Sequence, residues 1–412
     1  MAVLKPLRGL RPKPELANKV ASVPYDVVNT EEARNLAEGN ALSFLRVVRS
    51  EIEFPDGTDP YGDEIYQRAK QNLDTLIKDG VLEFENSPSL YIYQLDMNGH
   101  IQTGVVGCCP VEEYNNNLIK KHEKTRPDKE NDRTRHIKSI GAHAGPVFLT
   151  YKHQPQISSL VEQEIGALDP VYDFTAPDGV RHTVWKVAEA QALVNAFAEV
   201  PCTYVADGHH RIASAARCAA ELKSENPNHT GSESYNYFLS VLFPDDELQI
   251  LPYNRIIYSL GSLSASDVLV KLKENYEVAE GGNPVPDAKG HVSMFIDGKW
   301  FSLAPKANEA KITDPVESLE VSVLARKVLV PIFGIEDERT DKNVDFVGGI
   351  RGTKYLEQLV SSGKAACAFS LYPTSVAELM AVSDADMIMA PKSTWFEPKL
   401  RSGLIIHRFL NS

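Results

Sequence analysis

The clearest pattern along the chain is an apolar run that ends in a polar cluster and is followed by a helix. Residues 202–205 have the β-branched and aromatic content of a strand, and residues 212–222 are rich in strong helix formers. Between them the chain reads Asp207-Gly208-His209-His210-Arg211. This order predicts a strand, a turn and a helix, with the charged side chains on the turn.

Alternating apolar and polar positions elsewhere predict β-hairpins. Asn98-Gly99, Asp178-Gly179 and Asp297-Gly298 each separate two such runs, as hairpin turns do. The patterns also predict strands at residues 4–10, 41–52, 146–151, 238–243, 366–371 and 403–409, helices at 31–37, 63–79, 264–276, 315–328 and 353–361, and a charged helical segment at 111–135. The expected fold class is α/β or α+β with mixed sheets.

The length of 412 residues exceeds what most single cores contain. We expect an N-terminal region at residues 1–245, which carries a β-hairpin insertion, and a C-terminal α/β region at 246–412. The chain has 43 basic and 56 acidic residues, a net charge of −13, which disfavours nonspecific binding to nucleic acid or to an anionic membrane. Five cysteines without a CxxC pair indicate neither a disulfide framework nor a structural zinc site. With no signal-peptide pattern and no long apolar run, a cytoplasmic protein is expected.

The polar turn at residues 207–211 favours an anionic ligand. The first N–H groups of a helix have no intrahelical partner and attract phosphate, and Arg211 adds a positive charge. Gly208 allows a ligand to approach the backbone. The alternative is that Asp207 caps the helix and Arg211 is solvated. Four polar side chains beside a glycine are more than a cap requires.

A second polar segment covers residues 120–136. Such a charge run is usually a solvated helix face, but so many cations are unusual in an acidic chain and suggest a nucleotide. The residues of this segment that could hold phosphate oxygens or act in proton transfer are Lys121, His122, Glu123, Lys124, Thr125, Arg133 and His136.

Three further segments could contribute to a site. Asp26 follows Pro24-Tyr25 in a turn and could act as a base on a hydroxyl group, although a lone aspartate in a turn is more often structural. Residues 346–353 form a glycine-rich stretch before a helix, and 391–400 mix cations with aromatic residues. The chain contains neither a P-loop motif nor a GxGxxG motif.

Several of these motifs together resemble the domain of unknown function 1015 family, from about residue 3 to the C-terminus. Ala390 stands where members often carry proline. The turn at 207–211 is also similar to the phosphate-binding turn of the ParB/sulfiredoxin superfamily, which includes nucleotide-dependent free serine kinases. The motifs that carry the family resemblance are Pro24–Val27, His122–Thr125, Asp132-Arg133, Ala206–Arg211 and Pro391–Lys399.

This second resemblance implies a ParB/sulfiredoxin-like core around residues 202–222 and a kinase that phosphorylates free L-serine with ATP or ADP and Mg²⁺. The expected catalytic residues are Asp26, Glu123, Asp207, His209 and His210. The expected nucleotide-binding residues are Gly208, Arg211, Lys121, His122, Lys124, Thr125, Arg133 and His136. Asp26 and Glu123 are alternative bases, because the family's catalytic glutamate has no aligned counterpart.

Two other functions fit the same residues. One is a ParB-like nucleotide-binding regulator without turnover of a small molecule, and the other is a hydrolase of a phosphorylated metabolite. Association into a homodimer and the identity of the metal are left open.

Overall fold

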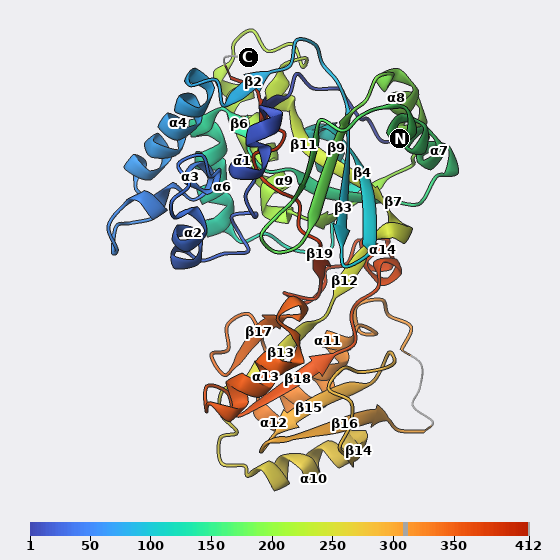
Figure 1. Ribbon diagram of the computed structural model, residues 1–412. Helices are drawn as coiled ribbons and strands as arrows, with labels where there is room; N and C mark the ends of the chain where they lie inside the picture. Colours follow the sequence, from blue (N-terminus) through green and yellow to red (C-terminus); the bar gives the residue numbers. More distant parts are fainter. Residues whose placement is uncertain (308–311, 411–412) are drawn as a thin grey trace. The chain divides into compact units, whose positions relative to one another are not determined.

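The computed structural model describes residues 1–307 and 312–410, which divide into two compact units (Figure 1). Unit 1 comprises Met1–Leu248 and the segment that begins at Pro398, and unit 2 comprises Gln249–Glu397. This division differs from the expected split at 245/246, because the C-terminal segment belongs to unit 1. Ile406 bridges to Leu10, and His407 pairs with His143.

Unit 1 is built on a mixed sheet with strand order β5-β10-β7-β11-β4-β3-β9-β8. The pairs β10–β5 and β11–β7 are parallel and the other neighbours are antiparallel, which confirms a mixed α/β fold class. The strands are β3 (Tyr91–Met97), β4 (His100–Pro110), β5 (Ile119–Lys120), β7 (Val147–Tyr151), β8 (Tyr172–Thr175), β9 (Arg181–Lys186), β10 (Thr203–Asp207) and β11 (Tyr237–Pro244). Short pairs join β1 (Leu10–Pro12) to β2 (Leu82–Phe84) and β6 (Ala142–His143) to β20 (His407–Arg408).

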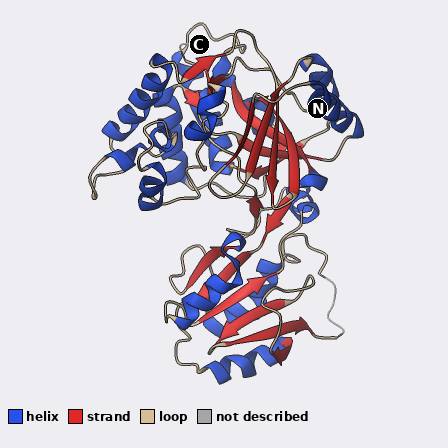
Figure 2. Ribbon diagram, in the orientation of Figure 1, coloured by secondary structure: helices blue, strands red, loops and turns tan. Residues whose placement is uncertain are grey.

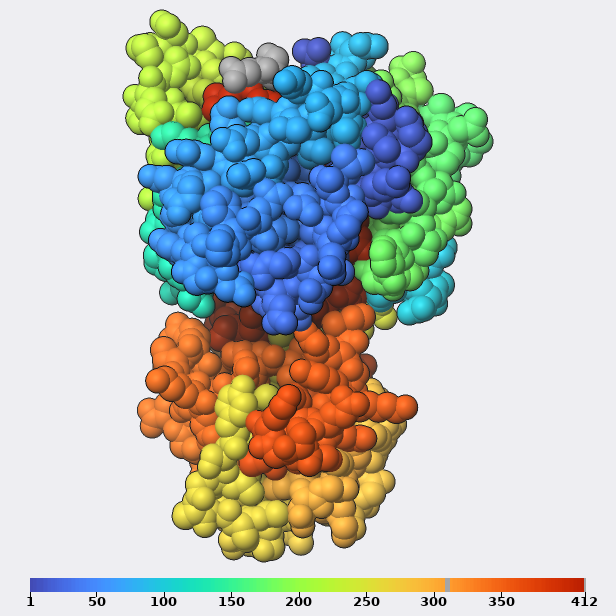
Figure 3. Space-filling model, turned by 60° about the vertical axis from the view of Figure 1, so that its left-hand side comes forward, coloured from blue at the N-terminus to red at the C-terminus, as the bar shows by residue number. Residues whose placement is uncertain are grey.

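Helices flank this sheet, with α4 and α6 drawn on its left and α7 and α8 on its right in Figure 1. The core contains Ile212 and Ala215 of α9 together with Leu149 and Val205 of the sheet. In Figure 3 the blue N-terminal residues cover one face of unit 1. The helices are α1 (Ala17–Val20), α2 (Thr30–Ala37), α3 (Leu45–Val48), α4 (Asp63–Lys78), α5 (Val111–Asn115), α6 (Pro127–Ile140), α7 (Pro155–Ala167), α8 (Ala190–Phe197) and α9 (His209–Glu225).

Unit 2 is built on an antiparallel sheet with strand order β14-β16-β15-β18-β13-β17, accompanied by the pair β12–β19 (Figure 2). Its strands are β12 (Gln249–Leu251), β13 (Tyr253–Ile257), β14 (Tyr276–Glu280), β15 (Val292–Ile296), β16 (Lys299–Pro305), β17 (Val344–Gly348), β18 (Cys367–Leu371) and β19 (Trp395–Glu397). Its helices are α10 (Ala265–Asn275), α11 (Glu320–Leu324), α12 (Val330–Phe333), α13 (Gly352–Ser361) and α14 (Val376–Asp384). No helix in residues 1–307 and 312–410 has the length and apolar character needed to span a bilayer.

Some expected elements differ from the structure. The strand expected at 41–52 is wrong, because this stretch contains α3 and a short 3₁₀ helix at Ser50–Glu53 whose apolar side chains are buried in a core cluster. The charged segment at 111–135 is divided into α5, β5 and α6. The helix expected from residue 315 begins at Glu320. Asp314 accepts hydrogen bonds from the backbone N–H groups of Val316 and Glu317, in the turn between Asp314 and this helix.

Candidate functional site

The turn between β10 and α9 has the geometry that the sequence pattern indicated. Gly208 is the N-cap residue and adopts φ 99° and ψ 31°, a left-handed conformation that glycine reaches without steric cost. No side chain caps this helix, so the interpretation of Asp207 as a helix cap is wrong. The start of α9, where a helix attracts an anion, is therefore not covered by a side-chain cap.

Asp207 instead forms an ion pair with Lys399 from the C-terminal segment. Lys399 Nζ lies 2.9 Å from Asp207 Oδ2. Although burial alone would raise the pKa of the Asp207 carboxyl group, the charges of Lys399 and Arg211 hold that pKa well below its usual range. Asp207 therefore stays ionised at neutral pH.

Arg401, two residues beyond Lys399, anchors the segment that carries Lys399 through its own buried contacts. Arg401 Nε donates to His182 Nε2 at 3.1 Å, and the same guanidinium group is paired with Asp178. The sequence pattern marked residues 391–400 as a segment of interest but did not single out Lys399. The partner of Lys399 lies almost two hundred positions away, so the spacing of residues carries no signal for this pair.

Arg211 connects the turn to Asp26. Its Nη2 lies 3.0 Å from both carboxylate oxygens of Asp26, and its Nη1 donates to the carbonyl oxygen of Pro146 at 2.8 Å. Burial alone would lower the pKa of Arg211, but Asp26 and Asp207 raise it above its ordinary value. Arg211 is therefore a permanent cation held between the two carboxylates.

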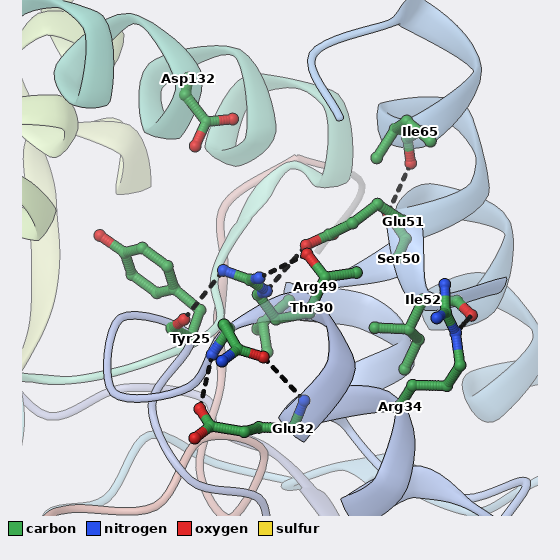
Figure 4. A network of polar contacts seen from close by, with 12 residues as sticks. Tyr25, Thr30, Glu32, Arg34, Arg49, Ser50, Glu51, Ile52, Ile65 and Asp132 are labelled. Atoms are coloured by element: carbon green, nitrogen blue, oxygen red, sulfur yellow. Dashed lines mark hydrogen bonds and ion pairs between the residues drawn. The ribbon is translucent and has the colours of Figure 1, made fainter. Parts of the chain in front are cut away.

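Arg133 and Arg211 both lie close to the Tyr25 ring. The guanidinium carbon of Arg133 is 4.2 Å from the centroid of the Tyr25 ring, while that of Arg211 is 5.9 Å away. Arg133 Nε donates to Asp132 Oδ2 at 2.9 Å. Figure 4 shows how the neighbouring Arg49 fixes the loop, because it donates to the backbone oxygen of Tyr25. The Tyr25 loop is thus held beside two guanidinium groups.

His122 and His209 form a buried pair of rings. Their centroids are 4.4 Å apart in an edge-to-face arrangement, and the residues are 2% and 6% exposed. Burial lowers the pKa of His122 to about 4, and burial with the neighbouring His122 ring lowers the pKa of His209 well below its usual value. Glu123 Oε2 lies 3.9 Å from His209 Nδ1. Both rings are therefore neutral.

Several ring nitrogens of this pair have no hydrogen-bond partner within the described part of the chain. They are both nitrogens of His122 and Nε2 of His209. A buried polar atom without a partner costs about 1–3 kcal/mol, so such atoms usually indicate a bound polar group. No group of three or more His, Cys, Asp or Glu side chains in the described residues is arranged to hold a metal ion.

Of four other expected residues, three have hydrogen-bond partners and one is exposed. Lys121 Nζ donates to the Tyr114 carbonyl oxygen at 3.3 Å, and Thr125 Oγ1 donates to Glu130 at 3.0 Å. His210 Nε2 accepts from the Arg126 N–H group at 3.0 Å, and Lys124 is exposed.

His136 is buried on α6, and its Nε2 donates to the Val47 carbonyl oxygen at 2.9 Å. The second polar segment is thus only partly a solvated face, because α6 packs against both α4 and α9. Contacts with His209 and with the Tyr25 loop bring His122, Glu123 and Arg133 to the neighbourhood of the turn. Lys121, Thr125 and His136 have structural partners instead.

A pocket of about 40 Å³ lies beside this cluster. Tyr25, Arg133 and Arg211 of the cluster are among its lining residues. Its other lining residues are Val48, His136, Ile137, His143, Ala144, Gly145, Val147, Phe238, Leu239 and Ser402.

The fold and this cluster define a mixed α/β protein with a charged strand-turn-helix site. The chain belongs to the family described as "Protein of unknown function (DUF1015)", which it matches over residues 4–322. No curated protein matches the chain.

Solved structures give distant matches. A free serine kinase in complex with AMP has 13% sequence identity and a TM-score of 0.35 over 73% of this chain and 92% of that one. A conserved hypothetical protein from Pyrococcus furiosus has 14% identity and a TM-score of 0.34 over 73% and 95% of the two chains. SbnI with a C-terminal truncation, from Staphylococcus aureus, has 11% identity and a TM-score of 0.37 over 72% and 85%.

Proposed function

We propose that this protein is a small-molecule kinase that transfers the terminal phosphoryl group of ATP or ADP to the hydroxyl group of free L-serine. The observation that carries the proposal is the convergence of charged and unpartnered polar groups on the uncapped N-terminus of α9. Lys399 and Asp26 come from distant parts of the chain and bond to the two ends of the turn, Asp207 and Arg211. The local resemblance of residues 207–211 to the turn of free serine kinases agrees with this assignment.

The turn supplies the groups that phosphate binding requires. Backbone N–H groups at the start of α9 and the permanent charges of Lys399 and Arg211 favour an anion at this point. The unpartnered nitrogen atoms of His122 and His209 are further polar contacts for a phosphate oxygen or for water bound to it.

The carboxylates near the turn suit Mg²⁺ only together with the phosphates of a bound nucleotide. Asp207 and Glu123 offer the oxygen atoms that Mg²⁺ prefers, and protein sites for this ion commonly use one or two carboxylates together with substrate phosphates. When bound, the ion neutralises charge on the phosphoryl group during transfer. The permanent charges of Lys399 and Arg211 would serve the same purpose.

The base that accepts the serine proton is Asp26 or Glu123. Asp207 is a poor proton acceptor, because Lys399 and Arg211 keep its pKa well below the usual range. The side chains of Asp26 and Glu123 are 36% and 35% exposed and thus reachable by a substrate. In phosphoryl transfer, positioning and charge neutralisation supply most of the rate, so loss of either carboxylate alone leaves part of the activity.

Phosphorus NMR with purified protein, Mg²⁺, ATP and L-serine tests the proposal, with ADP in place of ATP and omission of serine as parallel samples. The kinase predicts an O-phosphoserine signal that requires serine. Inorganic phosphate without phosphoserine would identify a hydrolase. Nucleotide binding without any product would identify a ParB-like regulator, and either of these results would overturn the kinase.

A further inference from the structure

The pocket beside Tyr25 is too small for a nucleotide. A single water molecule needs roughly 10–15 Å³ on the same measure, so about 40 Å³ holds about three water-sized groups. A carboxylate group with the carbon atom that bears it has this size. The proposed reaction has two substrates, and the pocket dimensions fit the smaller of them.

The polar lining of the pocket suits a carboxylate. A guanidinium group has five N–H donors in a planar fork that matches a carboxylate. Within the described residues, Arg211 donates through Nη1 to Pro146 and through Nη2 to Asp26, and Arg133 donates to Asp132 and to the Val48 carbonyl oxygen. Each guanidinium group therefore has more donors than these bonds occupy.

The charges around the pocket are balanced. Arg211 is paired with Asp26, and Arg133 with Asp132, so each of these two cations has an anionic partner. A ligand that is itself neutral overall but carries both charges suits such surroundings better than a simple anion does. Asp26 is 36% exposed and bonded to Arg211, which places an accessible carboxylate where an ammonium group can meet it.

The pocket also adjoins the turn that would hold the phosphates. Arg211 and Val147 line the pocket, and a Cβ atom built on Gly208 would lie 3.6 Å from Arg211 Nη1 and 3.6 Å from the Val147 Cα atom. A ligand whose carboxylate enters the pocket can therefore present its other end toward the start of α9.

We infer that this pocket binds the carboxylate end of a zwitterionic α-amino acid, with Arg133 and Arg211 on the carboxylate and Asp26 on the ammonium group. The inference rests on the proposed kinase function, for which the pocket is the acceptor subsite. It assigns to Arg133 a substrate contact rather than the nucleotide contact expected from the sequence, and to Arg211 a substrate contact in addition to its place at the phosphate-binding turn.

Binding measured by calorimetry on the full-length protein tests this inference, with and without saturating ADP. The probes are L-serine, L-serinamide, which lacks the carboxylate, and glycerate, which lacks the ammonium group. L-serine is expected to bind at least about tenfold more tightly than either analogue, as loss of a charge-assisted hydrogen bond implies. Equal binding of L-serine and L-serinamide, or no binding of L-serine in either condition, would overturn the inference.

The variant Arg133→Met should remove the preference for L-serine over L-serinamide, while Arg133→Lys should retain part of it. Arg135→Met is the matched control, because Arg135 lies on the same helix but is exposed and paired with Asp63. If Arg133→Met does not fold, the comparison of probes on the unaltered protein still decides. Selective binding of L-serine without phosphoserine formation would support the amino-acid pocket and reject the proposed kinase activity. Phosphoserine formation without a preference for the carboxylate would support the kinase activity and reject the pocket.

Discussion

Lys399 and Asp207 form an ion pair at 2.9 Å although 192 positions separate them in the chain. This pair links the C-terminal segment of unit 1 to the strand that leads into the polar turn. Lys399 holds Asp207 in its ionised form and places an additional positive charge beside the start of α9. A site that the sequence indicated as a single local motif is therefore completed by a distant segment.

Replacing Lys399 with methionine should weaken nucleotide binding or slow turnover by about ten- to a thousandfold, since each tenfold effect requires about 1.4 kcal/mol. The substitution retains most of the side-chain volume and removes the charge. Nucleotide titration and steady-state kinetics measure the effect. Lys223→Met, at the exposed far end of α9, is the control. Equal nucleotide affinity and equal turnover in the two variants would exclude a role of Lys399 in nucleotide binding or catalysis.

Replacing Arg211 with alanine should also reduce nucleotide affinity or rate by roughly ten- to a thousandfold. Arg211 is 9% exposed and bonded to Asp26, whereas the side chain of Arg217 on the same helix is 44% exposed and paired with Glu221. Arg217→Ala should leave both quantities close to those of the unaltered protein. A fully retained rate in Arg211→Ala, with the fold verified by circular dichroism, would reject this role.

Local signals in the sequence predicted the turn because its elements depend on neighbouring residues. A strand of β-branched and aromatic residues, a glycine and an alanine-rich helix are close in the chain, and the structure has β10, Gly208 and α9 at these positions. The helix at 31–37 was predicted for the same reason, since Asn29 and Glu32 form a capping box.

Other features depend on contacts that no local pattern records. Phe44, Leu45 and Val47 are buried in one core cluster, which fixes a short helix where partial alternation suggested a strand. The segment from Pro398 joins unit 1 through pairing with β1 and β6, so its apolar residues could not reveal which unit they would join. The roles of Lys399 and Arg401 could not be predicted for the same reason.

Replacing Gly208 with alanine should lower the free energy of unfolding by about 1–3 kcal/mol, because a side chain is strained at φ 99°. Denaturant titration measures this change, and nucleotide binding should fall as the turn distorts. Gly166→Ala is the control: it lies in α7, has open space around its Cβ position and should be neutral or stabilising. Equal stability of the two variants would show that the turn tolerates a side chain.

The stability of the protein should fall as the pH drops from about 6.5 toward 4. Burial lowers the pKa of His122 and His136 to about 4 and that of His182 to about 3, whereas in the unfolded chain their pKa is 6.5. In this window the unfolded chain binds protons that the folded chain does not, so each such histidine reduces the free energy of unfolding by up to about 1.4 kcal/mol per pH unit.

Urea titrations at several pH values between 7.5 and 4.5 measure this dependence, and a histidine substitution assigns it. His136→Gln can retain the hydrogen bond to the Val47 carbonyl oxygen, but it removes the ring that takes up a proton. The slope of the free energy of unfolding against pH should therefore decrease by up to about 1.4 kcal/mol per pH unit, which corresponds to one proton. An unaltered slope in His136→Gln would mean that His136 takes up its proton in the folded and unfolded states alike, and its burial would then contribute nothing to the acid sensitivity of the fold.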